Sequence, residues 1–129
     1  MSPDLFEQFA AGRLVTEADA WSAVEHPWKA HPTYSGVMLK DLIPAEGSGG
    51  LYSFHLVRIE PGMEIGLHTH PEHVEVHAVL EGSGRCRFTG EAHPYEPGTL
   101  ARIPAGVEHE VLADAGGLRL MAIFVRTGS

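Results

Sequence analysis

The sequence contains one cysteine, Cys86, among 129 residues, so an intramolecular disulfide is impossible. A zinc ribbon, which needs several cysteines, is excluded for the same reason. A chain without disulfides fits a reducing compartment. We therefore expect a cytoplasmic protein.

Basic residues are scarce, and long apolar runs are missing. Nine Lys and Arg stand against 17 Asp and Glu, which gives a formal net charge of -8. Such a charge would repel both the phosphate backbone of a nucleic acid and an anionic membrane surface. No apolar run approaches the roughly 20 residues of a membrane helix, and the first 14 residues lack the basic and apolar segments of a targeting signal. We expect a soluble protein whose partner is a small-molecule substrate, with no nucleic acid and no membrane.

The composition is that of a globular protein, because 43% of the residues are apolar and 20% are charged. The length suits one compact domain and is too short for two ordinary ones. One domain with a hydrophobic core is therefore expected.

The N-terminal segment, residues 1–33, has a pattern of its own. Apolar residues recur there at near-helical spacing: Leu5, Phe6, Phe9 and Leu14. Pro3 and Asp4 suit a first helical turn and Gly12 suits a helix end, so we predict a short helix. Pro27 and Pro32 then break regular structure, which predicts an arm laid over the domain surface.

Residues 34–129 consist of short segments rich in branched and aromatic residues, separated by turn formers. Many short strands at such spacing indicate an all-β sandwich or barrel. The tetrapeptide EGSG at residues 81–84 predicts a tight hairpin loop between two strands, because glycine accepts positive φ without steric cost. The segment Tyr34–Leu39 is expected at a sheet edge. Since exposed edges are often covered by another subunit, we expect a homodimer.

The stretch GLHTHPEHVEVHAVLEG, residues 66–82, concentrates four histidines. Strand alternation places Glu75 and His77 on one face and the neighbouring valines on the other. His68 and His70 have the same two-residue spacing, so both imidazoles can point the same way. Converging imidazole and carboxylate groups suit Fe, Mn, Ni, Zn or Cu, although a lone His-x-His is more often a surface pair.

The wider spacing resembles the two sequence motifs of the cupin family. Nine positions match at the required offsets: Gly62, His68, His70, Glu75, Gly82, Gly98, Pro104, Gly106 and His109. The last position of the second motif is Ala113 in place of the family's Asn. The resemblance covers roughly residues 34–125. It implies a double-stranded β-helix, the jelly-roll or cupin barrel, preceded by a short N-terminal helical arm.

The resemblance also implies one divalent transition metal ion bound by His68, His70, Glu75 and His109. At His77 many family members carry an aromatic residue, so this histidine is a candidate catalytic residue. An imidazole there would share the cavity with the metal and could move a proton. The alternative role is a hydrogen bond from His77 to a metal ligand or to a backbone group.

The remaining candidates are weaker. We expect His73 at the rim of the site. The resemblance to the cupin family implies that Cys86 points inward, as a small apolar wall residue. Three histidines lie beside prolines and are expected to be solvated: His26, His31 and His93. His55 could face either way.

The fold alone does not determine the function, since this barrel hosts many chemistries. A dioxygenase-type oxidoreductase ranks first among the metal-dependent enzymes that the sequence suggests. The first alternative is a metal-dependent lyase or isomerase with His77 as acid or base. The second is a non-enzymatic module that binds a small molecule.

Overall fold

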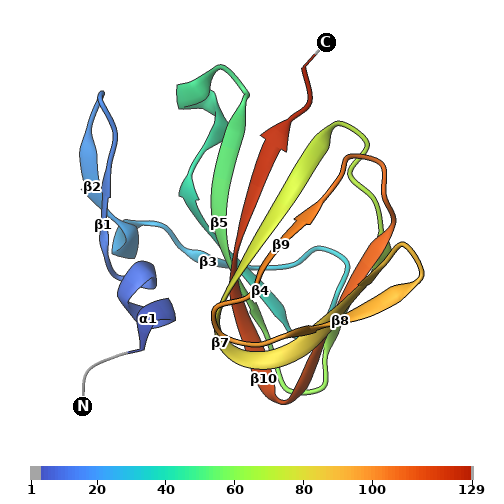
Figure 1. The fold of residues 1–129 in the computed structure, drawn as a ribbon. Helices are drawn as coiled ribbons and strands as arrows, with labels where there is room; N and C mark the ends of the chain where they lie inside the picture. The colour runs from blue at the N-terminus through green and yellow to red at the C-terminus, as the bar shows by residue number, and fades with distance from the viewer. Residues whose placement is uncertain (1–3, 129) are drawn as a thin grey trace.

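Two long, bent strands organise the fold: β7 (His73–Phe88) and β10 (His109–Arg126). In this computed structural model, which describes residues 4–128, they pair antiparallel along most of their length. The pairing shifts register near the middle of both strands, where the chain turns a corner. One half of each strand therefore belongs to one layer of the barrel, and the other half belongs to the second layer (Figure 1).

Six shorter strands complete the barrel: β3 (Trp28–Ala30), β4 (Val37–Ile43), β5 (Tyr52–Ile59), β6 (Glu64–His68), β8 (Glu91–Tyr95) and β9 (Leu100–Ile103). The strand order is β3-β4-β5-β10-β7-β8, with β6 paired to β10 and β9 paired to β7. Every pairing is antiparallel. This is a jelly-roll barrel, which confirms the predicted all-β fold class.

The predicted hairpin at residues 81–84 is wrong, because β7 continues through this segment as one strand. Gly82 and Gly84 lie where the antiparallel pairing of β7 with β10 shifts register. A Cβ at Gly84 would collide with the carbonyl oxygen of Leu112, and one at Gly82 would collide with that of Gly117. The two glycines thus allow the backbones of β7 and β10 to approach each other closely. The turn between β7 and β8 comes later, at Thr89 and Gly90, which both have positive φ.

The barrel interior is filled by branched and aromatic side chains from both layers. Its largest fully buried members include Tyr95, Ile59, Ile103, Leu118 and Leu120. Cys86 is completely buried in the same cluster, as expected for an apolar wall residue. Burial raises the pKa of its thiol to about 11.

The N-terminal segment begins with the predicted helix, α1 (Leu5–Ala10). The Asp4 side chain caps it by accepting a hydrogen bond from the backbone N–H of Glu7 at 2.8 Å. Pro3 lies outside the described residues. After the helix ends, β1 (Arg13–Val15) and β2 (Ala20–Ser22) form a small hairpin, which leads into a 3-10 turn, η1 (Ala23–Glu25). No helix within residues 4–128 is long and apolar enough to span a membrane.

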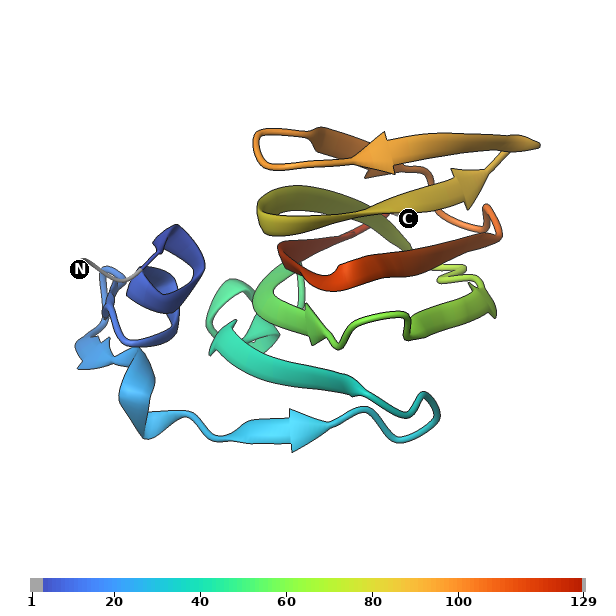
Figure 2. The same ribbon diagram turned by 90° about the horizontal axis from the view of Figure 1, so that it is seen from below.

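The helix and hairpin lie beside the barrel (Figure 2). They share a second apolar cluster with the outer face of β4 and β5, in which Phe6 and Ala10 pack with Leu42 and Leu56. Of the four apolar residues that suggested a helix, Phe6 and Leu14 belong to this cluster and help to cover one face of the barrel, whereas Leu5 and Phe9 are exposed. The boundary predicted at residue 34 stays a prediction.

Two expectations about the arm are wrong. Residues 28–30 are not irregular, since β3 pairs with β4 through Lys29 and Leu39. Consequently β4 lies between β3 and β5, and residues 37–39 are not at a sheet edge. A second 3-10 turn, η2 (Ala45–Ser48), connects β4 to β5. The edge of β4 is therefore already paired within the chain.

Candidate metal centre

Four side chains from three strands and one loop converge inside the barrel. His68 ends β6, His70 follows it, Glu75 lies on β7 and His109 begins β10. One potential ligand atom from each lies within 4.8 Å of the others. His109 and His68 are direct partners across β6 and β10, while Glu75 comes from the opposite layer. The structure thus brings together all four residues that the motifs singled out.

Backbone carbonyls orient two of the imidazoles. Nδ1 of His68 lies 2.7 Å from the carbonyl oxygen of Gly66, and Nδ1 of His109 lies 3.0 Å from that of Val107. Each Nδ1–H must donate in these bonds, since a carbonyl oxygen only accepts. Nε2 of both rings is thereby turned toward the cluster. Such a bond on the far nitrogen is the usual support of a metal-binding histidine.

The carboxylate of Glu75 lies at the centre of the cluster. Its Oε1 is 2.8 Å from Nε2 of His109 and 3.5 Å from Nε2 of His70. Burial opposes ionisation of Glu75, but hydrogen bonds from His109 and His77 outweigh it and hold the pKa well below its ordinary value. Burial likewise disfavours the charged form of His109, yet the bond to Glu75 raises its pKa.

His68 and His70 stay neutral more readily than free histidine, because burial lowers the pKa of both. Their lone pairs are then available to a metal. Three neutral imidazoles and one carboxylate form a donor set that divalent transition metals accept. The chemistry of these residues fits the metal that the sequence implied, and the cluster could hold one such ion.

His77 lies behind Glu75, away from the open part of the site. Its side chain is 3% exposed. Nε2 lies 2.9 Å from Oε2 of Glu75, and Nδ1 lies 2.7 Å from the hydroxyl of Tyr95. With the proton on Nε2, the ring donates to Glu75 and accepts from Tyr95. The geometry supports the hydrogen-bonding alternative, and the catalytic role of His77 stays a prediction.

A small cavity of about 200 Å³ opens beside the cluster. Besides the candidate ligands His68, His70 and Glu75, it is lined by His31, Leu39, Asp41, His55, Val57, Ile65, Ala122 and Phe124. At ~30 Å³ per liquid water, its volume matches about seven waters. The cavity therefore suits a small molecule.

The lining of the cavity includes two histidines whose positions the sequence did not predict. His55, which the sequence left open, faces the cavity from β5. The expectation that His31 is simply solvated is wrong, since it also lines the cavity. Its Nδ1 accepts hydrogen bonds from the backbone N–H groups of Thr33 and Tyr34, which fixes the loop that brings it there. No sequence signal pointed to His31, because its position depends on how this loop folds over the barrel.

Three other histidines lie outside both the cluster and the lining of the cavity. His73 begins β7, and its ring lies 6.2 Å from that of Phe124. His26 is part-buried and accepts a hydrogen bond from Nε1 of Trp21 at 2.7 Å, so it is not simply solvated. His93 belongs to β8 instead of a loop, with its ring 4.9 Å from that of Phe88.

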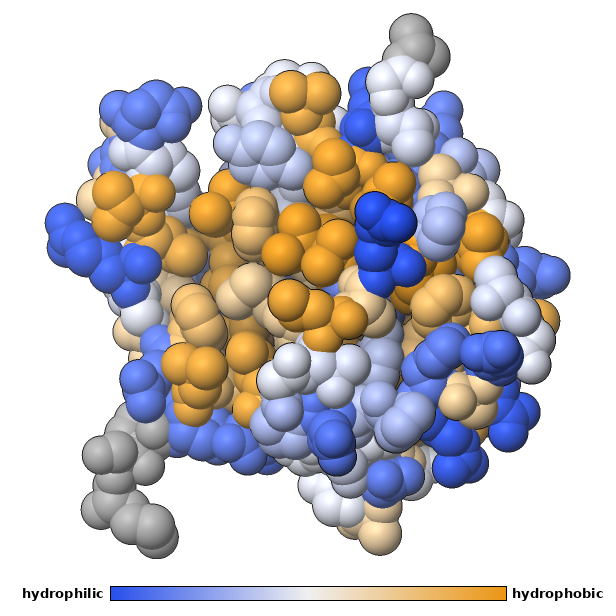
Figure 3. Space-filling model, in the orientation of Figure 1, coloured by the Kyte–Doolittle hydropathy of each residue, from blue (hydrophilic) through white to orange (hydrophobic). Residues whose placement is uncertain are grey.

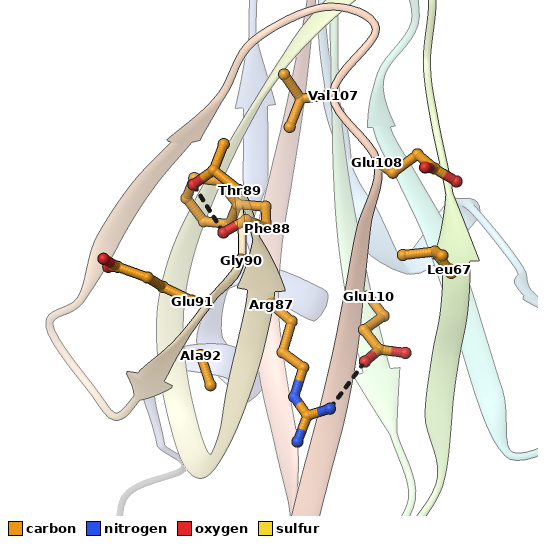
Figure 4. A pocket seen from close by; sticks show the side chains of 10 residues that line it. All are labelled: Leu67, Arg87, Phe88, Thr89, Gly90, Glu91, Ala92, Val107, Glu108 and Glu110. Atoms are coloured by element: carbon orange, nitrogen blue, oxygen red, sulfur yellow. Dashed lines mark hydrogen bonds and ion pairs between the residues drawn. The ribbon is translucent and has the colours of Figure 1, made fainter.

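A larger hollow of about 750 Å³ lies elsewhere, near the turn from β7 to β8. Figure 4 shows its lining, in which Arg87 and Glu110 form an ion pair at 3.6 Å. Glu91 and Glu108 add negative charge. None of the four clustered residues lines this hollow, so its size alone does not make it the functional site.

Comparison with known proteins identifies the family. The family model described as a cupin domain matches residues 55–125. The chain belongs to the cupin domain family. Its departure from the family's second motif, Ala113, is a buried core residue of β10.

Two curated relatives of this cupin are named L-ectoine synthase. The protein from Hyphomonas neptunium is 31% identical over 121 residues, which cover 92% of this chain and 76% of the relative. The protein from Mycolicibacterium vanbaalenii is 33% identical over 87 residues, which cover 66% of this chain and 65% of the relative. The clustered ligands and these relatives support a metal-dependent cupin enzyme.

Solved structures agree with the fold. Ectoine synthase from P. lautus superposes with a TM-score of 0.62 at 24% identity, covering 71% of this chain and 65% of that one. A cupin-2 domain from Rhodospirillum rubrum gives 0.71 at 18% identity, covering 91% and 80%. A predicted oxalate decarboxylase from Thermotoga maritima gives 0.71 at 21% identity, covering 79% and 92%. At such identities the likeness concerns the barrel alone.

Proposed function

We propose that this cupin is a metal-dependent lyase or cyclase that acts on a small organic molecule of the kind handled by L-ectoine synthase. The observation that carries the proposal is the ligand cluster opening into a cavity of about 200 Å³. The relative from Hyphomonas neptunium, similar over 92% of this chain, supports the reaction class. The substrate itself stays open within that class.

The metal site that we propose consists of His68, His70, Glu75 and His109, with one divalent Fe, Mn, Ni, Zn or Cu ion per chain. When bound, such an ion would act as a Lewis acid on an oxygen of the substrate. The chain's own contribution is to fix the two Nε2 atoms through backbone carbonyls, to hold Glu75 ionised, and to limit the volume around the substrate.

A dioxygenase, which ranks first from the sequence, becomes the second candidate. The same three histidines and one glutamate suit oxygen chemistry, so the ligand set does not separate the two classes. The names of the relatives favour the lyase class. Oxygen uptake in the presence of a turned-over substrate separates them, because a lyase consumes no oxygen.

The experiment begins with protein purified without a histidine tag, whose metal content is measured by mass spectrometry. L-Ectoine is then added as the probe, and both its binding and its conversion are followed by calorimetry and proton NMR. Binding that requires the metal supports the proposal. If a panel of related small molecules shows neither binding nor conversion on fully metallated protein, the lyase proposal is wrong. The matched control is the double variant His70→Ala with Glu75→Ala.

We retain the homodimer as part of the proposal, through a different surface. An apolar groove of about 450 Å³ lies between the β1–β2 hairpin and the barrel. Figure 3 shows apolar side chains gathered across this face. Its lining includes Ile43, Tyr52, Phe54, Ile123 and Val125. Since the chain carries a net charge of -8, copies repel one another electrostatically, and an apolar face is the surface that association can use.

The cytoplasmic location also stays a proposal.

A further inference from the structure

Asp41 and His55 form a hydrogen-bonded pair on the wall of the cavity. They are register partners on β4 and β5, and Oδ1 of Asp41 lies 2.8 Å from Nδ1 of His55. The second carboxylate oxygen accepts from Nζ of Lys29 at 3.0 Å. On the other side of the ring, Nε2 of His55 lies 2.8 Å from the hydroxyl of Ser53. The imidazole is thus held at both nitrogens, with a carboxylate behind it.

The pair faces the candidate metal centre. His55 lines the same cavity as His70 and Glu75, and its side chain is 23% exposed. The ring of Phe124 connects the two parts of the wall, with its centroid 4.9 Å from the ring of His70 and 5.6 Å from that of His55. In so small a cavity, a molecule in contact with the ligand cluster lies within reach of His55.

The surroundings of His55 suit proton transfer. Burial opposes ionisation of Asp41, but hydrogen bonds from Lys29 and His55 outweigh it and lower the pKa of Asp41, so its carboxylate accepts from Nδ1–H of His55. Nε2 of the neutral ring then carries the lone pair and accepts from the Ser53 hydroxyl, which can rotate away. His77 differs in that its two nitrogens face Glu75 and Tyr95, which are both buried.

We propose that His55 is the proton-transfer residue of this cavity and that Asp41 is its positioning residue. The inference rests on the proposed lyase or cyclase function. Nε2 of His55 takes a proton from an N–H or C–H bond of the substrate, and the electron pair of that bond forms a double bond to the adjacent carbon, which carries a hydroxyl group. The C–O bond of this hydroxyl breaks, and His55 gives its proton to the leaving hydroxyl, so that water departs and the imidazole is neutral again. Asp41 stabilises the transient imidazolium and fixes the tautomer.

The first test does not depend on turnover. Zinc-loaded protein labelled with ¹⁵N at histidine is titrated with oxalate, a small dicarboxylate that binds metals. The His55 signals are assigned by their loss in His55→Gln. We expect His55 to be the Nδ1–H tautomer. We also expect added oxalate to shift the ¹⁵N signals of His55 together with those of the metal-binding histidines. An Nε2–H tautomer overturns the inference, as does an unmoved His55 while oxalate binds.

The second test uses the substrate found by the screen above. His55→Gln should lower kcat by roughly 10²-fold or more at unchanged metal content, and Asp41→Asn should lower it by a smaller factor. His93→Gln is the matched control, because His93 lies on β8 outside the cavity, and it should turn over like the wild type. Equal loss in Ser53→Ala and His55→Gln would assign the chemistry to the hydroxyl and overturn the inference.

Failure of the two proposals can be told apart. If no compound is converted, the proposed lyase function is wrong. The NMR titration alone then decides whether His55 contacts a ligand bound at the metal. If turnover is found and His55→Gln keeps it, the function stands and the inference on His55 is wrong.

Discussion

The imidazole of His77 and the carboxylate of Glu75 form a buried hydrogen bond, with Nε2 2.9 Å from Oε2. This bond occupies one oxygen of Glu75 and leaves Oε1 to the ligand cluster. Replacing His77 with Phe removes the partner of a buried carboxylate. We expect the metal affinity to fall by roughly 10–100-fold, the usual effect of losing a group that supports a ligand. Competition with a chelator measures this change.

His77→Gln serves as the control for this prediction, since its amide can still donate to Glu75 and should keep most of the affinity. The opposite result has a clear meaning. Unchanged metal affinity in His77→Phe, combined with a turnover loss of about 10²-fold, would assign His77 the catalytic role considered from the sequence.

The metal centre itself is tested by His70→Ala combined with Glu75→Ala. We expect this double variant to bind no metal, because it lacks one imidazole and the central carboxylate. Added metal should then no longer raise its melting temperature, since a ligand stabilises only the state that binds it. His73→Ala, at the start of β7, should keep one ion per chain. Full occupancy in the double variant would contradict the assignment.

Gly84 allows β7 and β10 to pair at close range, where their register shifts. In Gly84→Ala the new Cβ would meet the backbone oxygen of Leu112, which cannot give way as a side chain can. We expect the free energy of unfolding to fall by roughly 1–3 kcal/mol, as for other overpacked positions. Gly116→Ala is the matched control, because its Cβ would point into open space. Urea unfolding compares the two variants, and equal stability would contradict the steric explanation.

Cys86 should be unreactive in the folded protein. Burial raises the pKa of its thiol from 9.0 to about 11, so at pH 8 almost no thiolate is present. A thiol reagent should modify one residue per chain only after unfolding. The raised pKa also contributes stability that is complete below pH 9 and is lost as the pH rises toward 11. Cys86→Ala should therefore show a shallower loss of stability above pH 9, and an identical slope would refute this.

The homodimer is tested by light scattering at micromolar concentration. We expect twice the mass of one chain, and Val125→Glu should raise the dissociation constant by about 10-fold or more, because a charge would be buried in the apolar groove. Leu67→Glu is the control, since Leu67 is exposed on a different face, in the hollow of Figure 4. A wild-type monomer would rule the dimer out.

The sequence by itself determined the barrel and the identity of the clustered residues. Turn formers between short branched segments predicted an all-β fold, and two motifs singled out His68, His70, Glu75 and His109. These features are readable because they are local: strand alternation sets which residues share a face, and motif offsets count residues along one strand or loop. The start of the helix near Asp4 follows from the same kind of local reasoning, whereas the inward position of Cys86 was implied by the resemblance to the cupin family.

Only the tertiary structure decided which groups meet across the barrel. The segment EGSG contains the residues of a hairpin turn, yet β7 continues through it, because pairing with β10 outweighs the local turn preference. Glycine is needed there because a Cβ atom would collide with the backbone of β10. The ring of His77 is hydrogen-bonded to Tyr95, which is 18 residues away in the sequence, and points away from the cavity. His55 meets Asp41 only because β4 and β5 pair in this register. Such contacts depend on strand register and layer packing, which distant residues set together and which no short stretch of sequence encodes.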